Sequence, residues 1–148
     1  MQKHNIMQLS NDFIMSEALR LVDEGRDVIF PVKGNSMLPF IIGGKEKAVF
    51  SPVKKIKTGR VVLAYVDGCR YVVHRIIKID NKKVTLMGDG NLKGREYCTL
   101  TDIKAEVNYV VDQNEKKRCL NTFWRLSAAL LWRILRPVRR YLLRLTSL

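Results

Sequence analysis

The sequence has few cysteines and no long apolar run, and both shortages exclude whole classes of protein. Its 148 residues include three cysteines, widely spaced and without a Cys-x-x-Cys pair, so neither a disulfide framework nor a zinc site is expected. No uninterrupted apolar stretch reaches the roughly 18 residues that span a bilayer, and the polar N-terminus lacks the apolar core of a signal peptide. We therefore expect a protein that is cytoplasmic or peripherally attached to the cytoplasmic membrane.

Acidic residues are also scarce, above all near the C-terminus. The chain carries 27 lysines and arginines against 14 aspartates and glutamates, a formal net charge of +13. Glu115 is the last acid of the chain, and nine basic residues follow it. This asymmetry predicts a basic C-terminal segment with an anionic partner, either a membrane surface or a nucleic acid.

The pattern of apolar residues predicts a mainly β domain of the α+β class. One helix is expected from Ser10 or Asn11 to Glu24, where apolar residues recur at helical spacing. Asp67-Gly68 is a hairpin signal between two strong β runs. Strands are expected, mostly antiparallel, at 27–33, 48–53, 61–66, 71–79, 84–87 and 103–111.

Composition divides the chain into four parts. An N-terminal helical segment (1–26) precedes the β domain (27–112), which is expected to carry the function. A polar linker (113–120) then leads to a basic amphipathic helix (121–148).

Three residues in the order Ser, His, Asp are candidates for nucleophilic catalysis. Ser36 lies in a Gly/Pro turn directly after a strand, which favours an exposed hydroxyl and free backbone N–H groups. His74 lies in the apolar strand YVVHRII, and a neutral imidazole can accept a serine proton near neutral pH. Asp89, in the turn MGDGN, is the candidate that orients the imidazole. Taken singly, each also has a structural explanation: a turn residue, a core histidine and an Asp-Gly turn pair.

The segment GNSMLPF (34–40) resembles the Ser-Met-x-Pro nucleophile box of the S24/S26 peptidases, the class of signal peptidases and SOS-repressor self-cleaving domains. The segments GRVVLAYVDGCRYVVHRIIKID and VTLMGDGN are similar to later boxes of this class and occur in the same order. Most bacterial members use a Ser-Lys dyad, whereas His74 is similar to the base of the endoplasmic-reticulum-type and archaeal signal peptidases. Lys78, on the same predicted strand face, is the alternative base. Glu96 is the only acid in the stretch after the last box, where the reticulum-type enzymes have a second acidic pair.

The resemblance implies an antiparallel β fold of the signal-peptidase and SOS-repressor type, with serine endopeptidase activity and no metal or cofactor. Ser36 would attack a peptide carbonyl, His74 would take the proton, and the backbone at Ser36 and Asn35 would hold the oxyanion. The peptide or preprotein substrate would bind as an extended strand. Its apolar pockets are assigned to Phe30, Val32, Met37 and Val72. Two alternatives stay open: an inactive peptide-binding module of the same fold, and a self-cleaving regulator.

Residues 121–145 are predicted to form an amphipathic helix, which Pro137 should bend or split. Arginines on one face and apolar residues on the other are typical of a helix in a membrane interface, so an anionic membrane surface is the expected partner. Nucleic acid is disfavoured, because the chain lacks a helix-turn-helix and the aromatic residues lie on the wrong face for stacking. Packing of the helix on the β domain is the alternative. Membrane contact is assigned to Trp124, Arg125, Trp132, Arg133, Arg136, Arg140 and Arg144.

Overall fold

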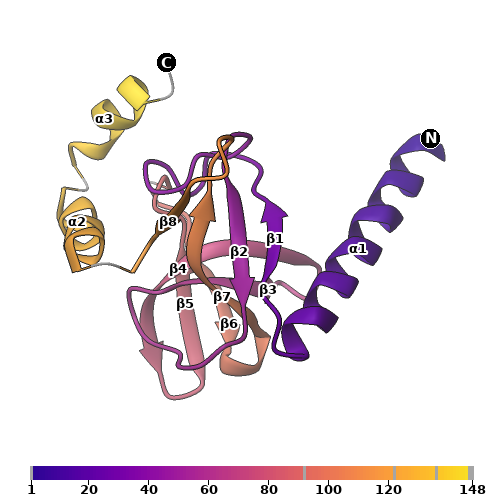
Figure 1. Ribbon diagram of the computed structural model, residues 1–148. Helices are drawn as coiled ribbons and strands as arrows, with labels where there is room; N and C mark the ends of the chain where they lie inside the picture. The colour runs from indigo at the N-terminus through magenta and orange to yellow at the C-terminus, as the bar shows by residue number, and fades with distance from the viewer. Residues whose placement is uncertain (1, 92, 122, 136, 147–148) are drawn as a thin grey trace.

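The computed structural model describes the backbone of residues 2–91, 93–121, 123–135 and 137–146, with side chains from residue 12 onward except at 92, 122–126, 136, 139 and 146–148. A long N-terminal helix, a β domain and two C-terminal helices follow one another along the chain (Figure 1). The elements are α1 (Gln2–Asp23), β1 (Val28–Pro31), β2 (Lys47–Ser51), β3 (Val61–Val66), β4 (Arg70–Asp80), β5 (Lys83–Met87), β6 (Glu96–Thr99), the 3-10 helix η1 (Leu100–Asp102), β7 (Ile103–Val111), β8 (Lys117–Cys119), α2 (Phe123–Ile134) and α3 (Arg139–Thr146).

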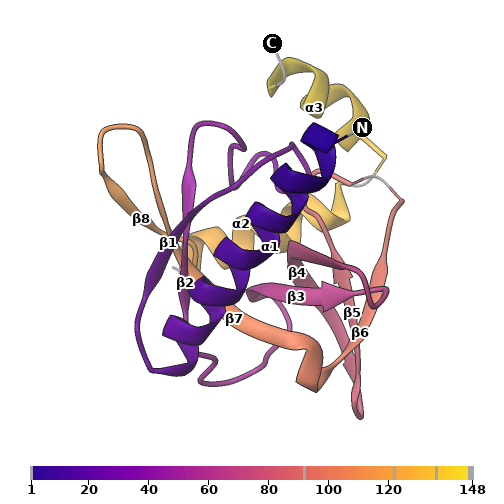
Figure 2. The same ribbon diagram turned by 90° about the vertical axis from the view of Figure 1, so that its right-hand side faces the viewer.

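The strands form one curled antiparallel sheet, which confirms the predicted mainly β, α+β fold. Their order is β1-β2-β7-β3-β4-β5-β6, and β8 pairs with β7 off this path. The view in Figure 2 places α1 in front of the sheet, and α2 lies on the other side of the β domain (Figures 1 and 2). The two ends of the chain therefore cover different sides of the same sheet.

Strand β3 is central to the core because it is buried on both faces. Val61 and Leu63 belong to one apolar cluster, whereas Val62, Ala64 and Val66 belong to a second. Side chains alternate across a strand, so an uninterrupted apolar run such as VVLAYV is what a strand with two covered faces requires. The first cluster is closed by Val22 of α1, which is 1% exposed. Helix α1 thereby packs on the domain rather than standing apart from it.

The hairpin between β3 and β4 lies where the sequence predicts it. Asp67 and Gly68 both have positive φ, 55° and 64°, the left-handed backbone that a tight hairpin turn favours. Val66 pairs with Arg70 across the turn, and this register places Val62 opposite His74. A local turn signal thus fixes the strand position of the candidate base.

Several elements differ from the sequence prediction. Helix α1 begins at Gln2 rather than at a Ser10 or Asn11 cap, because the first residues contain no glycine or proline to interrupt it. Strands β6 and β8 were not predicted, and β8 lies inside the expected polar linker. Both are short and are formed through pairing with β5 and β7 rather than through an apolar pattern of their own. The C-terminal helix is split around Pro137, as predicted.

Candidate active site

The candidate nucleophile lies in a tightly closed loop between β1 and β2. The N–H of Gly44 donates to the carbonyl of Val32 at 2.8 Å, and this bond joins the two ends of the loop. A Cβ at Gly43 would lie 1.8 Å from the carbonyl oxygen of Gly34, so only glycine fits at position 43. Met37 is 2% exposed and anchors the loop in the core, while the neighbouring Ser36 is partly exposed. The loop therefore presents the serine from a fixed backbone.

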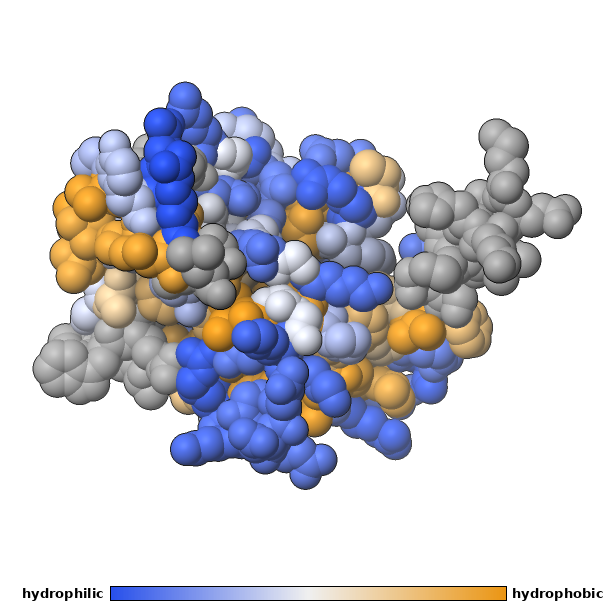
Figure 3. Space-filling model, turned by 90° about the horizontal axis from the view of Figure 1, so that it is seen from above, coloured by the Kyte–Doolittle hydropathy of each residue, from blue (hydrophilic) through white to orange (hydrophobic). Residues whose placement is uncertain are grey.

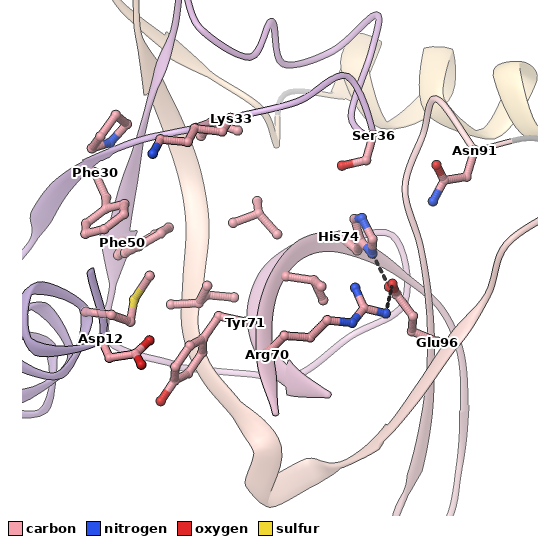
Figure 4. Close-up of a pocket in the computed structure, with 16 residues that line it drawn as sticks. Asp12, Phe30, Lys33, Ser36, Phe50, Arg70, Tyr71, His74, Asn91 and Glu96 are labelled. Carbon is pink, nitrogen blue, oxygen red and sulfur yellow. Dashed lines mark hydrogen bonds and ion pairs between the residues drawn. The ribbon is translucent and has the colours of Figure 1, made fainter. Parts of the chain in front are cut away.

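Ser36 and His74 line the same cavity of about 520 Å³. Figure 4 shows Ser36, His74 and Asn91 around one end of this cavity, with the histidine ring between the serine and Glu96. His74 is 4% exposed and comes from the middle of β4. Among the hydrogen bonds of the described residues, none joins Ser36 Oγ to His74.

The carboxylate of Glu96 holds the other side of the histidine ring. It lies within hydrogen-bond range of Nδ1, and an ionised carboxylate only accepts, so Nδ1 carries the proton and Nε2 is the basic nitrogen. Arg70 donates to the same carboxylate at 2.8 Å and also to Asp67 at 3.1 Å. The hydrogen bond with Glu96 is the largest cause of the raised pKa of Arg70. Desolvation acts in the opposite direction, and the bond with Asp67 raises the pKa further. Glu96 is thus held between a permanent cation and the imidazole.

Among the hydrogen bonds of the described residues, the Asp89 carboxylate pairs with Arg75 and not with His74, which differs from its predicted place as the third member of the triad. Its carboxylate forms a two-pronged ion pair with Arg75, at 2.8 Å from Nε and 2.7 Å from Nη2. His74 and Arg75 are neighbours on β4 and point to opposite sides of the sheet, so an acid paired with Arg75 lies on the wrong side for the imidazole. Arg75 also donates to the carbonyl of Gly59 at 2.6 Å and lies over the ring of Phe40. The Arg75–Asp89 pair therefore ties the Asp89 loop to β4 and to the nucleophile loop.

The loop that contains Asp89 lies directly against Ser36. The N–H of Gly90 donates to the carbonyl of Ser36 at 2.8 Å. A Cβ at Gly88 would lie 2.3 Å from that carbonyl oxygen and 3.1 Å from His74 Nε2. Gly88 is therefore the point at which the nucleophile loop, β4 and the Asp89 loop converge, and it places the basic nitrogen of His74 close to Ser36.

Three of the four residues assigned to the apolar pockets line the cavity. Phe30, Val32 and Val72 line the cavity, whereas Met37 lies beneath the loop in the core and does not. Helix α1 supplies a wall that was not predicted, through Asp12 and Met15. No pattern within α1 indicates this role, because it depends on where the helix packs.

Two further predictions concern the base and the oxyanion. The side chain of Lys78 is 70% exposed and pairs with Asp80, so it is not the base. A bulge in β4 between Ile76 and Lys78 interrupts the alternation that would place it beside His74. Among the described residues, the backbone N–H of Ser36 has no acceptor, as an oxyanion donor requires, and Asn35 uses its carbonyl to accept from Leu38.

Comparison with known proteins identifies the family of the chain. The Peptidase S24-like family matches residues 2–106, and the chain belongs to this family. Membership places it among S24-type serine peptidases and the related regulators of that fold. No curated protein and no solved structure was found to match the chain. In the described part of the chain no three His, Cys, Asp or Glu residues converge as a metal site would require.

Proposed function

We propose that the protein is a serine endopeptidase in which Ser36 is the nucleophile, His74 the general base and Glu96 the acid that orients the base. The contact between Glu96 and His74 Nδ1 carries this proposal. It fixes the tautomer whose Nε2 is the acceptor, and Gly88 brings that nitrogen and Ser36 to the same point. The arrangement is the geometric pattern of a nucleophile, a base and an orienting acid.

The reaction is acyl transfer. His74 Nε2 takes the hydroxyl proton as Ser36 Oγ forms a bond with the scissile carbonyl carbon. Glu96 stabilises the resulting imidazolium, and the N–H of Ser36 donates to the oxyanion. His74 then gives its proton to the leaving amine as the peptide bond breaks. A water molecule, deprotonated by the same nitrogen, releases the acyl group from Ser36.

The cavity suits an extended peptide with small apolar side chains. Phe30 and Phe50 stack at 5.5 Å on one side, and Val72 lies on β4. Among the described strands, β1 pairs with β2 alone, so its other edge can accept an added strand. Two basic residues, Lys33 and Arg70, and two acidic residues, Asp12 and Glu96, also line the cavity, so its charged groups are balanced. We therefore propose polypeptide substrates with small apolar residues beside the cleaved bond.

A serine-directed phosphonate probe followed by peptide mapping tests the proposal. We expect labelling at Ser36, loss of labelling in Ser36→Ala and His74→Ala, and unchanged labelling in Ser51→Ala, whose serine lies in β2 away from the cavity. Cleavage of a peptide library by the native protein, abolished by Ser36→Ala, completes the test.

The two alternatives predict different results in the same experiments. An inactive peptide-binding module would bind library peptides without cleaving them, and Ser36 would stay unlabelled. A self-cleaving regulator would lose mass on long incubation of the purified chain, in a Ser36-dependent manner, without cleaving added peptides. Full activity of Ser36→Ala would overturn the assignment.

A further inference from the structure

Helix α2 packs on the β domain through one face and leaves an apolar face outward. Ala129 is 3% exposed, and the indole N–H of Trp132 donates to the carbonyl oxygen of Asp89 at 2.7 Å. Residues three apart share a helix face, so these two define the inner side. On the outer side, Leu130 and Leu131 are each 56% exposed and Ile134 is 68% exposed. Trp132 is a predicted membrane contact, yet its indole faces the β domain. At this residue the helix packs on the domain, as the alternative prediction has it.

The exposed apolar surface continues onto α3. Val138, Tyr141 and Leu145 keep 45%, 65% and 71% of their surface exposed. In Figure 3 apolar side chains gather at the left-hand edge of the molecule, the side on which Figure 1 draws α2 and α3. We call this set the arm surface; it consists of Leu130, Leu131, Ile134, Val138, Tyr141 and Leu145.

Positive charge accompanies the arm surface. Arg133, Arg140 and Arg144 are exposed on the same two helices. The sequence contains no aspartate or glutamate after Glu115, so positive side chains dominate this part of the chain. Of the other predicted contacts, Arg136 and the side chains of Trp124 and Arg125 lie outside the described residues.

We propose that α2 and α3 dock on the surface of an anionic lipid bilayer, with the arm surface in the acyl boundary and the arginines at the phosphates. A bilayer offers an apolar layer that can bury the aliphatic side chains. Beside this layer it offers anionic headgroups that can pair with the arginines. A nucleic acid offers the anionic charge without an apolar layer for aliphatic side chains. None of the described helices combines the length and the apolar character needed to cross a bilayer, so the docking proposed is peripheral.

Helices α2 and α3 together form the C-terminal arm. Docking through this arm would also place the candidate site near the lipid. Trp132 connects α2 to the loop of Asp89 and Asn91, and Asn91 lines the cavity. Figure 4 draws a helix of the arm beyond Ser36 and Asn91. The docking itself does not depend on catalysis, so its test is independent of the proposed peptidase activity.

Vesicle co-sedimentation of the full chain tests the proposal. We expect binding to vesicles of equal parts phosphatidylglycerol and phosphatidylcholine, and much weaker binding to phosphatidylcholine alone. The triple variant Leu130→Ser, Leu131→Ser, Ile134→Ser should lose at least about tenfold in affinity, because its apolar burial in lipid is removed. The affinity of the variant Arg133→Gln, Arg140→Gln for anionic vesicles should fall about fivefold per arginine. Added salt should reduce the difference between this variant and the native chain.

A matched control removes exposed apolar groups elsewhere. Ile29 and Tyr97 are 56% and 52% exposed on the sheet, and Ile29→Ser, Tyr97→Ser should bind vesicles as the native chain does. Circular dichroism and thermal melting verify that each variant is folded. The proposal is overturned if the triple variant binds as well as the control, or if neutral and anionic vesicles bind equally. It is also overturned if duplex DNA binds the arm more tightly than vesicles do.

Discussion

Glu96 lies two strands away from His74 in the sheet, yet its carboxylate meets the imidazole at Nδ1 and receives a second bond from Arg70. The acid that serves the candidate base is therefore itself fixed by an arginine from the start of the same strand β4. Removal of the Glu96 carboxylate should lower activity without unfolding the protein, since His74 stays in its buried position on the strand.

Glu96→Gln should lower kcat by about 10³- to 10⁴-fold at neutral pH, because the amide cannot stabilise an imidazolium as a carboxylate does. Steady-state kinetics on a cleaved library peptide measures this. Asp67→Asn is the matched control, since Asp67 also pairs with Arg70 but does not touch His74. A native rate in Glu96→Gln would remove Glu96 from the mechanism.

Asp89→Asn should instead affect stability. The Arg75 and Asp89 side chains are 3% and 4% exposed, and removal of one partner leaves the other charge buried, at a cost of about 3–5 kcal/mol. Urea unfolding measures this loss. Asp80→Asn, in an exposed pair with Lys78, should change the free energy of unfolding by less than about 1 kcal/mol. Equal stability of the two variants would contradict the role given to Asp89.

Gly88→Ala should abolish cleavage, because the added methyl group would lie 2.3 Å from the backbone oxygen of Ser36 and force the two loops apart. Gly94→Ala in the same connection meets nothing closer than 3.8 Å and should keep its activity. Initial rates for the two variants, with melting curves for both, make the comparison. Native activity in Gly88→Ala would show that the close approach is not needed.

The thiols should differ sharply in reactivity. Burial raises the pKa of Cys98 to about 11, with smaller contributions from Asp102 and Glu96, so the thiol stays protonated and unreactive near pH 8. Cys69 is exposed in the β3–β4 turn and serves as the internal reference. Maleimide labelling followed by peptide mapping should modify Cys69 first in the native state and Cys98 only on unfolding. Equal labelling rates would contradict the burial of Cys98.

Local signals predicted the parts of the fold that depend on neighbours in sequence. The Asp67-Gly68 turn and the flanking alternation placed His74 on its strand, and the break around Ser36 placed the nucleophile in a loop. Strand β6 escaped prediction because its four residues are specified by their pairing with β5. That strand carries Glu96, so the contact between Glu96 and His74 could not be predicted without the strand.

Side-chain direction accounts for the remaining differences. Asp89 lies in the family-like box VTLMGDGN, but the acid that meets His74 is decided by the side of the sheet it faces, which depends on distant pairings. Trp132 is similar: helical periodicity gives its angle around α2 but not which angle faces the domain.

The hydrogen bond from Trp132 to Asp89 joins a part of the chain outside the family match to a part inside it. The family match ends at residue 106, and Trp132 lies beyond it, yet the tryptophan secures a loop that contacts the candidate nucleophile. The β domain and helix α2 are therefore linked at the loop that contacts Ser36. A substitution at Trp132 should therefore shift the loop whose Gly90 N–H donates to Ser36, although Trp132 itself does not line the cavity.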